Sequence, residues 1–146
     1  MHSKDFLACL GKPASDPDVQ KLLTSVGVAK LKMPKDDIEA RADLPKLGLS
    51  LIFKPEARGS SVLVFQAVQF FSDAEKGYKS FSGALPNGLL LTDTQASVRK
   101  KLGKPSETKA AFRLDRWKQP GGVLTVEYTK EDLRLGAITV HLPIKG

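Results

Sequence analysis

The side chains that could perform covalent chemistry are few and far apart in this chain. The sequence contains two histidines, His2 near its start and His141 near its end, and one cysteine, Cys9. A nucleophilic triad would need His141 beside a carboxylate and either a serine or Cys9, and no nucleophile-elbow sequence is present. His141 alternates with apolar neighbours in a strand pattern, so we interpret it as a surface residue.

Metal and phosphate sites are equally hard to assemble from these residues. Adjacent carboxylates occur at Asp36-Asp37 and Glu131-Asp132, both in turn-like settings where acidic residues are common. Arg58-Gly59-Ser60 and Gly121-Gly122 lack the Gly-Lys-Ser/Thr ending of a nucleotide-binding loop. Two carboxylates could still meet in space as a glycosidase pair, although no pattern favours it. We therefore predict a protein that is not an enzyme and holds no metal or cofactor.

The net charge of +7 is concentrated in the second half of the chain. Residues 1–75 contain 10 Lys or Arg and 10 Asp or Glu, whereas residues 76–146 contain 13 and 6. Most of the excess lies in residues 99–118, where Glu107 and Asp115 are the acidic residues. Such a patch would attract an acidic partner and accelerate the encounter. The alternative is a solvated surface without a partner.

Aromatic residues accompany these basic ones. On a strand, Arg113, Asp115 and Trp117 share one face, and Phe112 and Leu114 point to the other. If Phe112 and Leu114 belong to the core, Trp117 is displayed beside charges of both signs, and tryptophan often dominates protein interfaces. Alternatively, Trp117 folds over the edge of the core with its indole N–H bonded to a carbonyl.

Two classes of macromolecule could bind this segment. Phosphate neutralisation with aromatic stacking would hold a nucleic acid on residues 99–118, but Asp115 interrupts the patch and only 7% of the residues are aromatic. A protein with an acidic surface is the favoured partner. The side chains expected to contact it are Trp117, Arg116, Arg113, Asp115, Lys118, Tyr78 and Phe81.

Helix and strand signals alternate along the chain. Asp16 as N-cap and Pro17 at the first position predict a helix over residues 16–27, shorter helices are expected at 3–10 and from Thr92, and Gln95 is a possible capping-box partner of Thr92. Strands are expected at 38–42, 47–53, 62–71, 112–118, 123–129 and 135–142. The run 62–71 is apolar on both faces, which is typical of a central strand covered on both sides, unless one face awaits a partner.

A short repeat suggests how these elements are organised. Leu10-Gly11-Lys12-Pro13 recurs as Leu102-Gly103-Lys104-Pro105, each time at the end of an expected short helix. We therefore predict an α+β fold with helices packed on the sheet, in which two related units, each a helix followed by an antiparallel meander, form one domain over residues 1–146. The first unit would span residues 1–75, the connection 76–91 and the second unit 92–146.

Composition places the expected protein in the cytoplasm. The hydrophobic fraction of 41% is that of a folded globular chain. No apolar run approaches the roughly 20 residues that cross a bilayer, and the first residues lack the pattern of a secretory signal. A single cysteine allows no internal disulfide. We expect no membrane interaction.

Several short stretches together resemble a known group of proteins. They are Leu10-Gly11-Lys12-Pro13, Asp16-Pro17-Asp18-Val19, Gly77-Tyr78-Lys79, Gly83-Ala84-Leu85-Pro86-Asn87-Gly88-Leu89, Thr92-Asp93-Thr94, Lys101-Leu102-Gly103-Lys104-Pro105 and Asp115-Arg116-Trp117. This pattern is similar to that of immunity proteins encoded beside bacterial polymorphic toxins, including those of type VI secretion. The resemblance implies a cytoplasmic protein that binds and occludes its cognate toxin. A nucleic-acid-binding protein and an adaptor or chaperone for a secreted effector are the alternatives.

Overall fold

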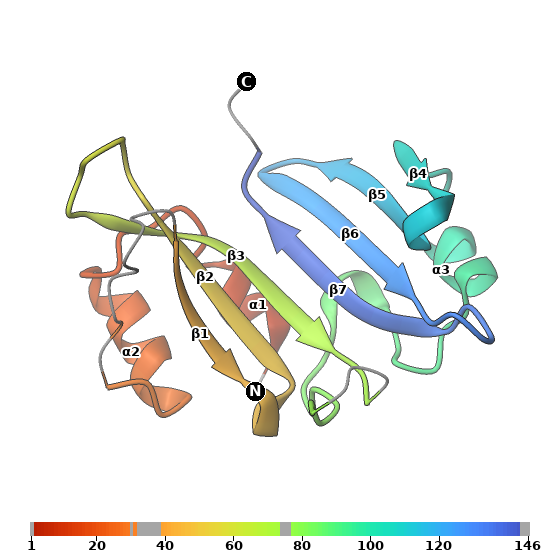
Figure 1. Ribbon diagram of the computed structural model, residues 1–146, viewed down its shortest axis with the longest axis horizontal. Helices are drawn as coiled ribbons and strands as arrows, with labels where there is room; N and C mark the ends of the chain where they lie inside the picture. Colours follow the sequence, from red (N-terminus) through yellow and green to blue (C-terminus); the bar gives the residue numbers. More distant parts are fainter. Residues whose placement is uncertain (1, 30, 32–38, 74–76, 144–146) are drawn as a thin grey trace.

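An antiparallel sheet with helices on one side gives the chain an α+β fold (Figure 1). The computed structural model describes residues 2–29, 31, 39–73 and 77–143. The strands are β1 (Ala40–Leu44), β2 (Leu49–Pro55), β3 (Leu63–Phe71), β4 (Glu107–Lys109), β5 (Leu114–Gln119), β6 (Gly122–Tyr128) and β7 (Leu135–His141). They form a seven-stranded sheet in the order β1-β2-β3-β7-β6-β5-β4. The described α-helices are α1 (Ser3–Leu7), α2 (Pro17–Ser25) and α3 (Gln95–Leu102).

Local capping chemistry sets where the helices begin. The prediction for α2 is confirmed, because the Asp16 side chain accepts a hydrogen bond from the Asp18 N–H at 2.8 Å and Pro17 opens the helix. In α3 the N-cap is Thr94, which accepts from the Ser97 N–H at 3.3 Å, so the predicted start at Thr92 is two residues too early.

Pairing between β3 and β7 joins the two halves of the chain into one sheet. The predicted strand over residues 62–71 is present as β3 and is central, with β2 on one side and β7 on the other. The predicted strands of the second half are also present as the meander β5-β6-β7. The short edge strand β4 was not predicted, and Ile38 at the start of the first predicted strand lies outside the described residues.

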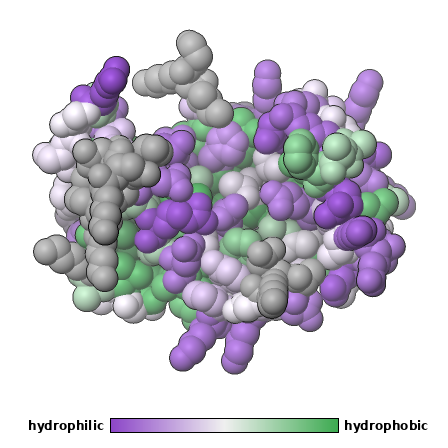
Figure 2. Space-filling model, viewed as in Figure 1, coloured by the Kyte–Doolittle hydropathy of each residue, from purple (hydrophilic) through white to green (hydrophobic). Residues whose placement is uncertain are grey.

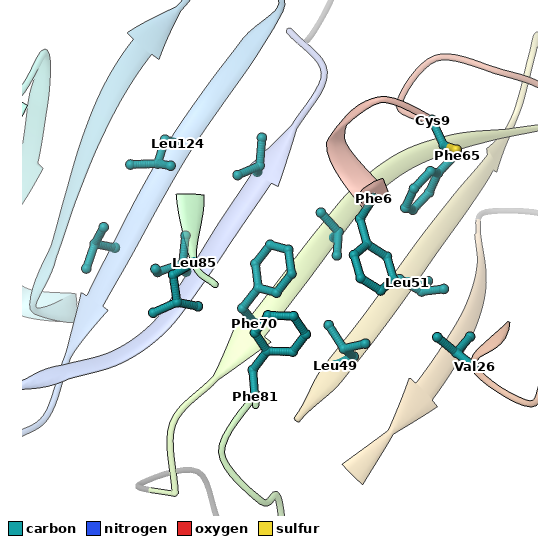
Figure 3. Close-up of a cluster of buried hydrophobic side chains, with 14 of the residues drawn as sticks. Phe6, Cys9, Val26, Leu49, Leu51, Phe65, Phe70, Phe81, Leu85 and Leu124 are labelled. Atoms are coloured by element: carbon teal, nitrogen blue, oxygen red, sulfur yellow. The ribbon is translucent and has the colours of Figure 1, made fainter. Parts of the chain in front are cut away.

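The hydrophobic core lies between the sheet and the helices. Phe6 of α1, Val19 of α2 and Val98 of α3 are fully buried against the same side of the sheet. Figure 3 shows Phe6 beside Phe70 of β3, with their ring centroids 5.9 Å apart. Burying each side chain of this size contributes about 1.5–3 kcal/mol, so this face of the sheet accounts for most of the hydrophobic stabilisation.

A glycine directly before β2 allows a loop to close over one end of the sheet. Gly48 has a φ of 68°, and a Cβ there would lie 2.4 Å from the Lys79 carbonyl oxygen and 2.5 Å from the Phe81 nitrogen. The loop is held by hydrogen bonds from the Lys79 N–H to the Pro45 oxygen and from the Phe81 N–H to the Phe71 oxygen. This close approach directs Phe81 into the core and leaves Tyr78 beside the opposite face of the sheet.

Candidate binding face

The sheet face opposite the helices, termed the open face, presents the residues that alternate with the core positions. Among the described residues, all three α-helices lie on the other side of the sheet, behind it in the view of Figure 1. Figure 2 shows the open face, where hydrophilic side chains extend from the side of β1 to the side of β4 with smaller hydrophobic areas between them. The expected covering of β3 on both sides is therefore wrong for the described part of the chain, and the alternative of one uncovered face fits it.

One row of polar side chains crosses the open face from edge to edge. Cross-strand pairing places side by side, one from each strand, Asp43, Ser50, Gln69, Thr139, Thr125, Arg116 and Glu107. Six steps of about 4.8 Å make this polar row about 29 Å long. A row of this length is comparable to the width of a standard protein interface, in which about 800 Å² is buried on each partner.

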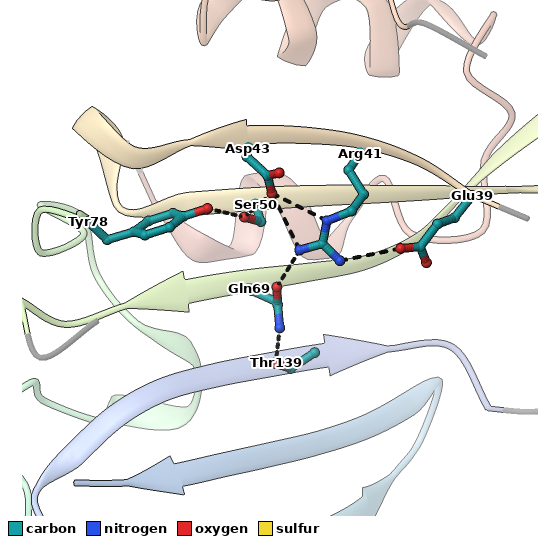
Figure 4. Close-up of polar contacts among 7 residues, drawn as sticks. All are labelled: Glu39, Arg41, Asp43, Ser50, Gln69, Tyr78 and Thr139. Atoms are coloured by element: carbon teal, nitrogen blue, oxygen red, sulfur yellow. Dashed lines mark hydrogen bonds and ion pairs between the residues drawn. The ribbon is translucent and has the colours of Figure 1, made fainter. Parts of the chain in front are cut away.

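Hydrogen bonds fix the β1 end of the polar row (Figure 4). The Ser50 hydroxyl donates to Asp43 Oδ1 at 2.7 Å and lies 3.1 Å from the Tyr78 hydroxyl. Tyr78 is in turn held by Phe71, whose ring centroid is 4.2 Å away. Ser50 is fully buried at the base of this cluster, so its hydroxyl orders Asp43 and Tyr78 and does not itself contact a partner.

A second set of hydrogen bonds fixes the side chains of the row on β3 and β7. Arg41 Nη2 donates to Gln69 Oε1 at 3.2 Å, and Gln69 Nε2 donates to the Thr139 hydroxyl at 3.2 Å. Arg41 also forms ion pairs of 3.4 Å with Glu39 and with Asp43. The charges at the β1 end therefore largely neutralise one another, and the centre of the row consists of neutral hydrogen-bonding groups.

The other end of the row is cationic. A cleft of about 550 Å³, termed the cationic cleft, opens between β4, β5, β6 and the end of β7. Its lining includes Arg116, Lys118, Val123 and His141, with Glu107 at the β4 side. Arg116 Nη1 lies 3.6 Å from Glu107 Oε2, which is longer than a direct hydrogen bond.

The structure contradicts the predicted display of Trp117 and Phe81. Trp117 is 5% exposed and faces the helices, and its indole N–H donates to the Gly103 carbonyl at 3.2 Å. This is the alternative arrangement that the sequence left open. Phe81 is also buried and packs against Phe70, with ring centroids 4.8 Å apart. The display of Trp117 required Phe112 in the core, and Phe112 is instead 69% exposed in a 3₁₀ turn.

Asp115 is buried rather than displayed, because it joins α3 to the sheet. Its carboxylate accepts hydrogen bonds from Arg99 at 2.9 and 3.0 Å, from the Thr108 hydroxyl at 2.7 Å and from the Tyr128 hydroxyl at 2.9 Å. Burial would raise the pKa of Asp115, but these hydrogen bonds outweigh burial and hold that pKa below its usual range. This cluster stabilises the fold, and Asp115 itself is inaccessible to a partner.

The remaining predicted contact residues are accessible but do not form one patch. Arg116 and Lys118 lie on the open face, and Tyr78 borders its other end. Arg113 is exposed at a positive φ of 52°, beside a separate polar cleft of about 470 Å³ at the β6–β7 turn. The basic segment 99–118 is thus divided between the two sides of the sheet.

The residues at the centre of the row, which sequence reasoning missed, are neutral. Gln69, Thr125 and Thr139 are polar residues in strands that are mostly apolar, and these polar positions were the available signal. Their alignment depends on the pairing of β3 with β7, whose partners are 70 residues apart for Gln69 and Thr139.

Neither a metal cluster nor a membrane-spanning helix is found in the described ranges. There, no group of three or more His, Cys, Asp or Glu side chains is placed to hold a metal ion, and no helix is long and apolar enough to cross a bilayer. Asp36-Asp37 lies outside these ranges. The sequence matches no protein-family model and has no significant similarity to a curated protein or a solved structure.

Proposed function

We propose that this chain is a cytoplasmic immunity protein that binds a secreted toxin across its open face and occludes the toxin's substrate site. The observation that supports this most is the polar row, which crosses the full width of the sheet and presents hydrogen-bonding groups such as those of Gln69, Thr139 and Arg116. Because a hydrogen bond already joins the half-buried Gln69 and Thr139, these two side chains lose little entropy when a partner binds them. The class of partner comes from the sequence resemblance.

Charge along the row favours a protein over a nucleic acid. A nucleic acid lying along the open face would find cations at the cleft end, but at the β1 end Glu39 and Asp43 outnumber Arg41 and repel phosphate. Trp117, which would have supplied the stacking surface, is buried. A protein can instead match charges of both signs and bond to the neutral groups between them.

We also propose that the chain works without catalysis and is built from two related units. The absence of catalysis is supported by two observations. His141 Nδ1 is occupied by a 2.7 Å hydrogen bond to the Leu142 oxygen, and Cys9 is buried. For the two units, support comes from Gly11 and Gly103, which occupy the same place in the repeated motif and both have positive φ values, 88° and 83°.

Co-purification with the product of the neighbouring gene tests this function. The two proteins would be expressed together with a tag on one of them, and a stable 1:1 complex is expected. Cells expressing the neighbour alone should stop growing, and cells that also express this chain should recover. An adaptor or chaperone would form the complex but leave its partner toxic. A harmless neighbour that forms no complex would contradict the proposal.

The dependence of binding affinity on salt concentration distinguishes a nucleic-acid partner from a protein partner. If Arg116 and Lys118 bound single-stranded DNA, the logarithm of the association constant should fall linearly with the logarithm of the salt concentration. The slope should be about −0.7 per phosphate neutralised. A protein complex centred on neutral hydrogen bonds should lose much less affinity over the same range.

A further inference from the structure

The cationic cleft has its positively charged side chains on the β5 side and an uncharged floor. Lys118, Val123 and His141 are directly paired across β5, β6 and β7, so the first and last of them flank Val123 on the open face. Arg116 precedes Lys118 by two residues and therefore points to the same face. The positive charge of Arg116 and Lys118 exceeds the negative charge of Glu107, which is half exposed at the cleft side.

These side chains have hydrogen-bonding groups to offer a ligand. Arg116 Nε is buried and has no hydrogen-bond acceptor among the described residues, and the 3.6 Å contact with Glu107 leaves the guanidinium weakly held. Lys118 is exposed and forms no ion pair within the described part of the chain. His141 Nδ1 donates to the Leu142 oxygen, since a carbonyl can only accept, and Nε2 is the remaining nitrogen.

A carboxylate fits this arrangement better than a phosphate. Its two oxygens match the planar fork of a guanidinium, and the resulting bidentate pair is among the stronger hydrogen-bonded contacts in proteins. Arg116, Lys118 and Glu107 together carry a net formal charge of +1, which a singly charged carboxylate balances. The neutral threonines that continue the polar row next to the cleft also suit a protein chain.

We infer that the cationic cleft captures an aspartate or glutamate side chain of the protein partner. The carboxylate would pair with Arg116 and be approached by Lys118, while the neighbouring residues of the partner lie along the polar row. This inference rests on the proposed function, because it assumes that a protein occupies the open face. It identifies one anchoring contact, at the end of the row where charge is not already balanced.

A peptide titration tests the cleft without the natural partner. Isotope-labelled protein would be titrated with acetyl-Gly-Glu-Gly-Glu-Gly-amide, and the side-chain Nε signal of Arg116 and the ring signals of His141 would be followed by NMR. Saturable shifts confined to the cleft are expected, with a dissociation constant on the order of 1 mM. The same peptide with glutamine in place of glutamate should cause no shift. Arg116→Gln should weaken binding about tenfold, and the matched Arg58→Gln, in the β2–β3 turn, should leave it unchanged.

Two results would overturn the inference. One is the absence of shifts in the cleft on addition of the glutamate peptide. The other is that inorganic phosphate or an octathymidylate shifts the same NMR signals and binds more tightly than the glutamate peptide, which would make the cleft a phosphate site.

Titration of the neighbouring gene product separates this inference from the proposed function. Weakening of that complex by Arg116→Gln and Lys118→Gln, but not by Lys104→Gln, supports both. If the complex forms equally well with the two cleft variants, the inference about the cleft is contradicted and the proposed function is unaffected. Failure of that product to bind, together with peptide binding in the cleft, contradicts the function and leaves the cleft as a carboxylate site.

Discussion

Asp115 of β5 and Arg99 of α3 form a two-pronged ion pair, in which the carboxylate oxygens lie 2.9 and 3.0 Å from Nε and Nη2. The Asp115 side chain is fully buried, whereas that of Arg99 is 41% exposed. The pair therefore fastens α3 to the sheet. If its hydrogen bonds to Asp115 were removed, water could not reach the buried carboxylate to replace them.

Asp115→Asn should destabilise the fold, because it leaves Arg99, Thr108 and Tyr128 without their charged acceptor. We expect the free energy of unfolding in urea to fall by about 2–4 kcal/mol, near the cost of breaking a buried pair. The control is Asp18→Asn in the exposed Lys12–Asp18 pair, which should cost much less. Equal losses in the two variants would show that Asp115 does not fasten the helix.

The same cluster should make stability depend on pH at both ends of the range. The folded pKa of Asp115 lies below its unfolded value, so its contribution is complete above about pH 4 and is lost as the pH falls further. Burial and the hydrogen bond to Asp115 raise the pKa of Tyr128, so its contribution is lost as the pH rises above about 10. Unfolding measured across pH should show that the difference between wild type and Asp115→Asn shrinks in acid. A difference that persists unchanged at low pH would contradict this assignment.

Gly48→Ala should destabilise the protein more than other glycine substitutions. The new Cβ would meet the backbone of the loop at Lys79 and Phe81, and it would also occupy a positive φ. We expect a loss of about 3 kcal/mol or more in chemical denaturation. Gly59→Ala also has a positive φ but has open space around it, so its loss should be about 1 kcal/mol. Similar losses in the two variants would show that the loop does not close against Gly48.

Trp117 should behave as a buried residue in solution. As the sole tryptophan, it should give a blue-shifted emission that resists quenching by acrylamide until the protein unfolds. Trp117→Phe should cost about 1 kcal/mol through the lost bond to the Gly103 carbonyl and leave partner binding unchanged. Efficient quenching in the folded state would contradict the buried position.

Local patterns in the sequence were sufficient to predict much of the fold. Asp16 and Pro17 marked α2 because capping is a short-range effect, and alternation marked the meander β5-β6-β7. The same alternation correctly grouped Asp115 with Trp117, yet the choice of core face was wrong. A charged residue normally marks the solvent side, and here Arg99, 16 residues earlier, supplies a partner that only the folded chain brings close.

The candidate site was harder to predict than the fold. Arg116 and Lys118 were identified from their charge, and the structure places both on the open face. The polar row was missed because it depends on strand pairing over long separations, and the side chains at its centre are neutral. β4 was missed because all three of its residues are exposed and carry no apolar signal.

Affinity for the neighbouring gene product measures the role of the open face most directly. Thr139→Arg places a long charged side chain at the centre of the polar row, where Thr139 is half buried, and Thr24→Arg places the same change on the exposed side of α2. Calorimetric titration should show that Thr139→Arg weakens binding about a hundredfold or more, while Thr24→Arg binds as wild type does. Circular dichroism would verify that both variants are folded. A folded Thr139→Arg variant that binds with wild-type affinity would contradict binding through the open face.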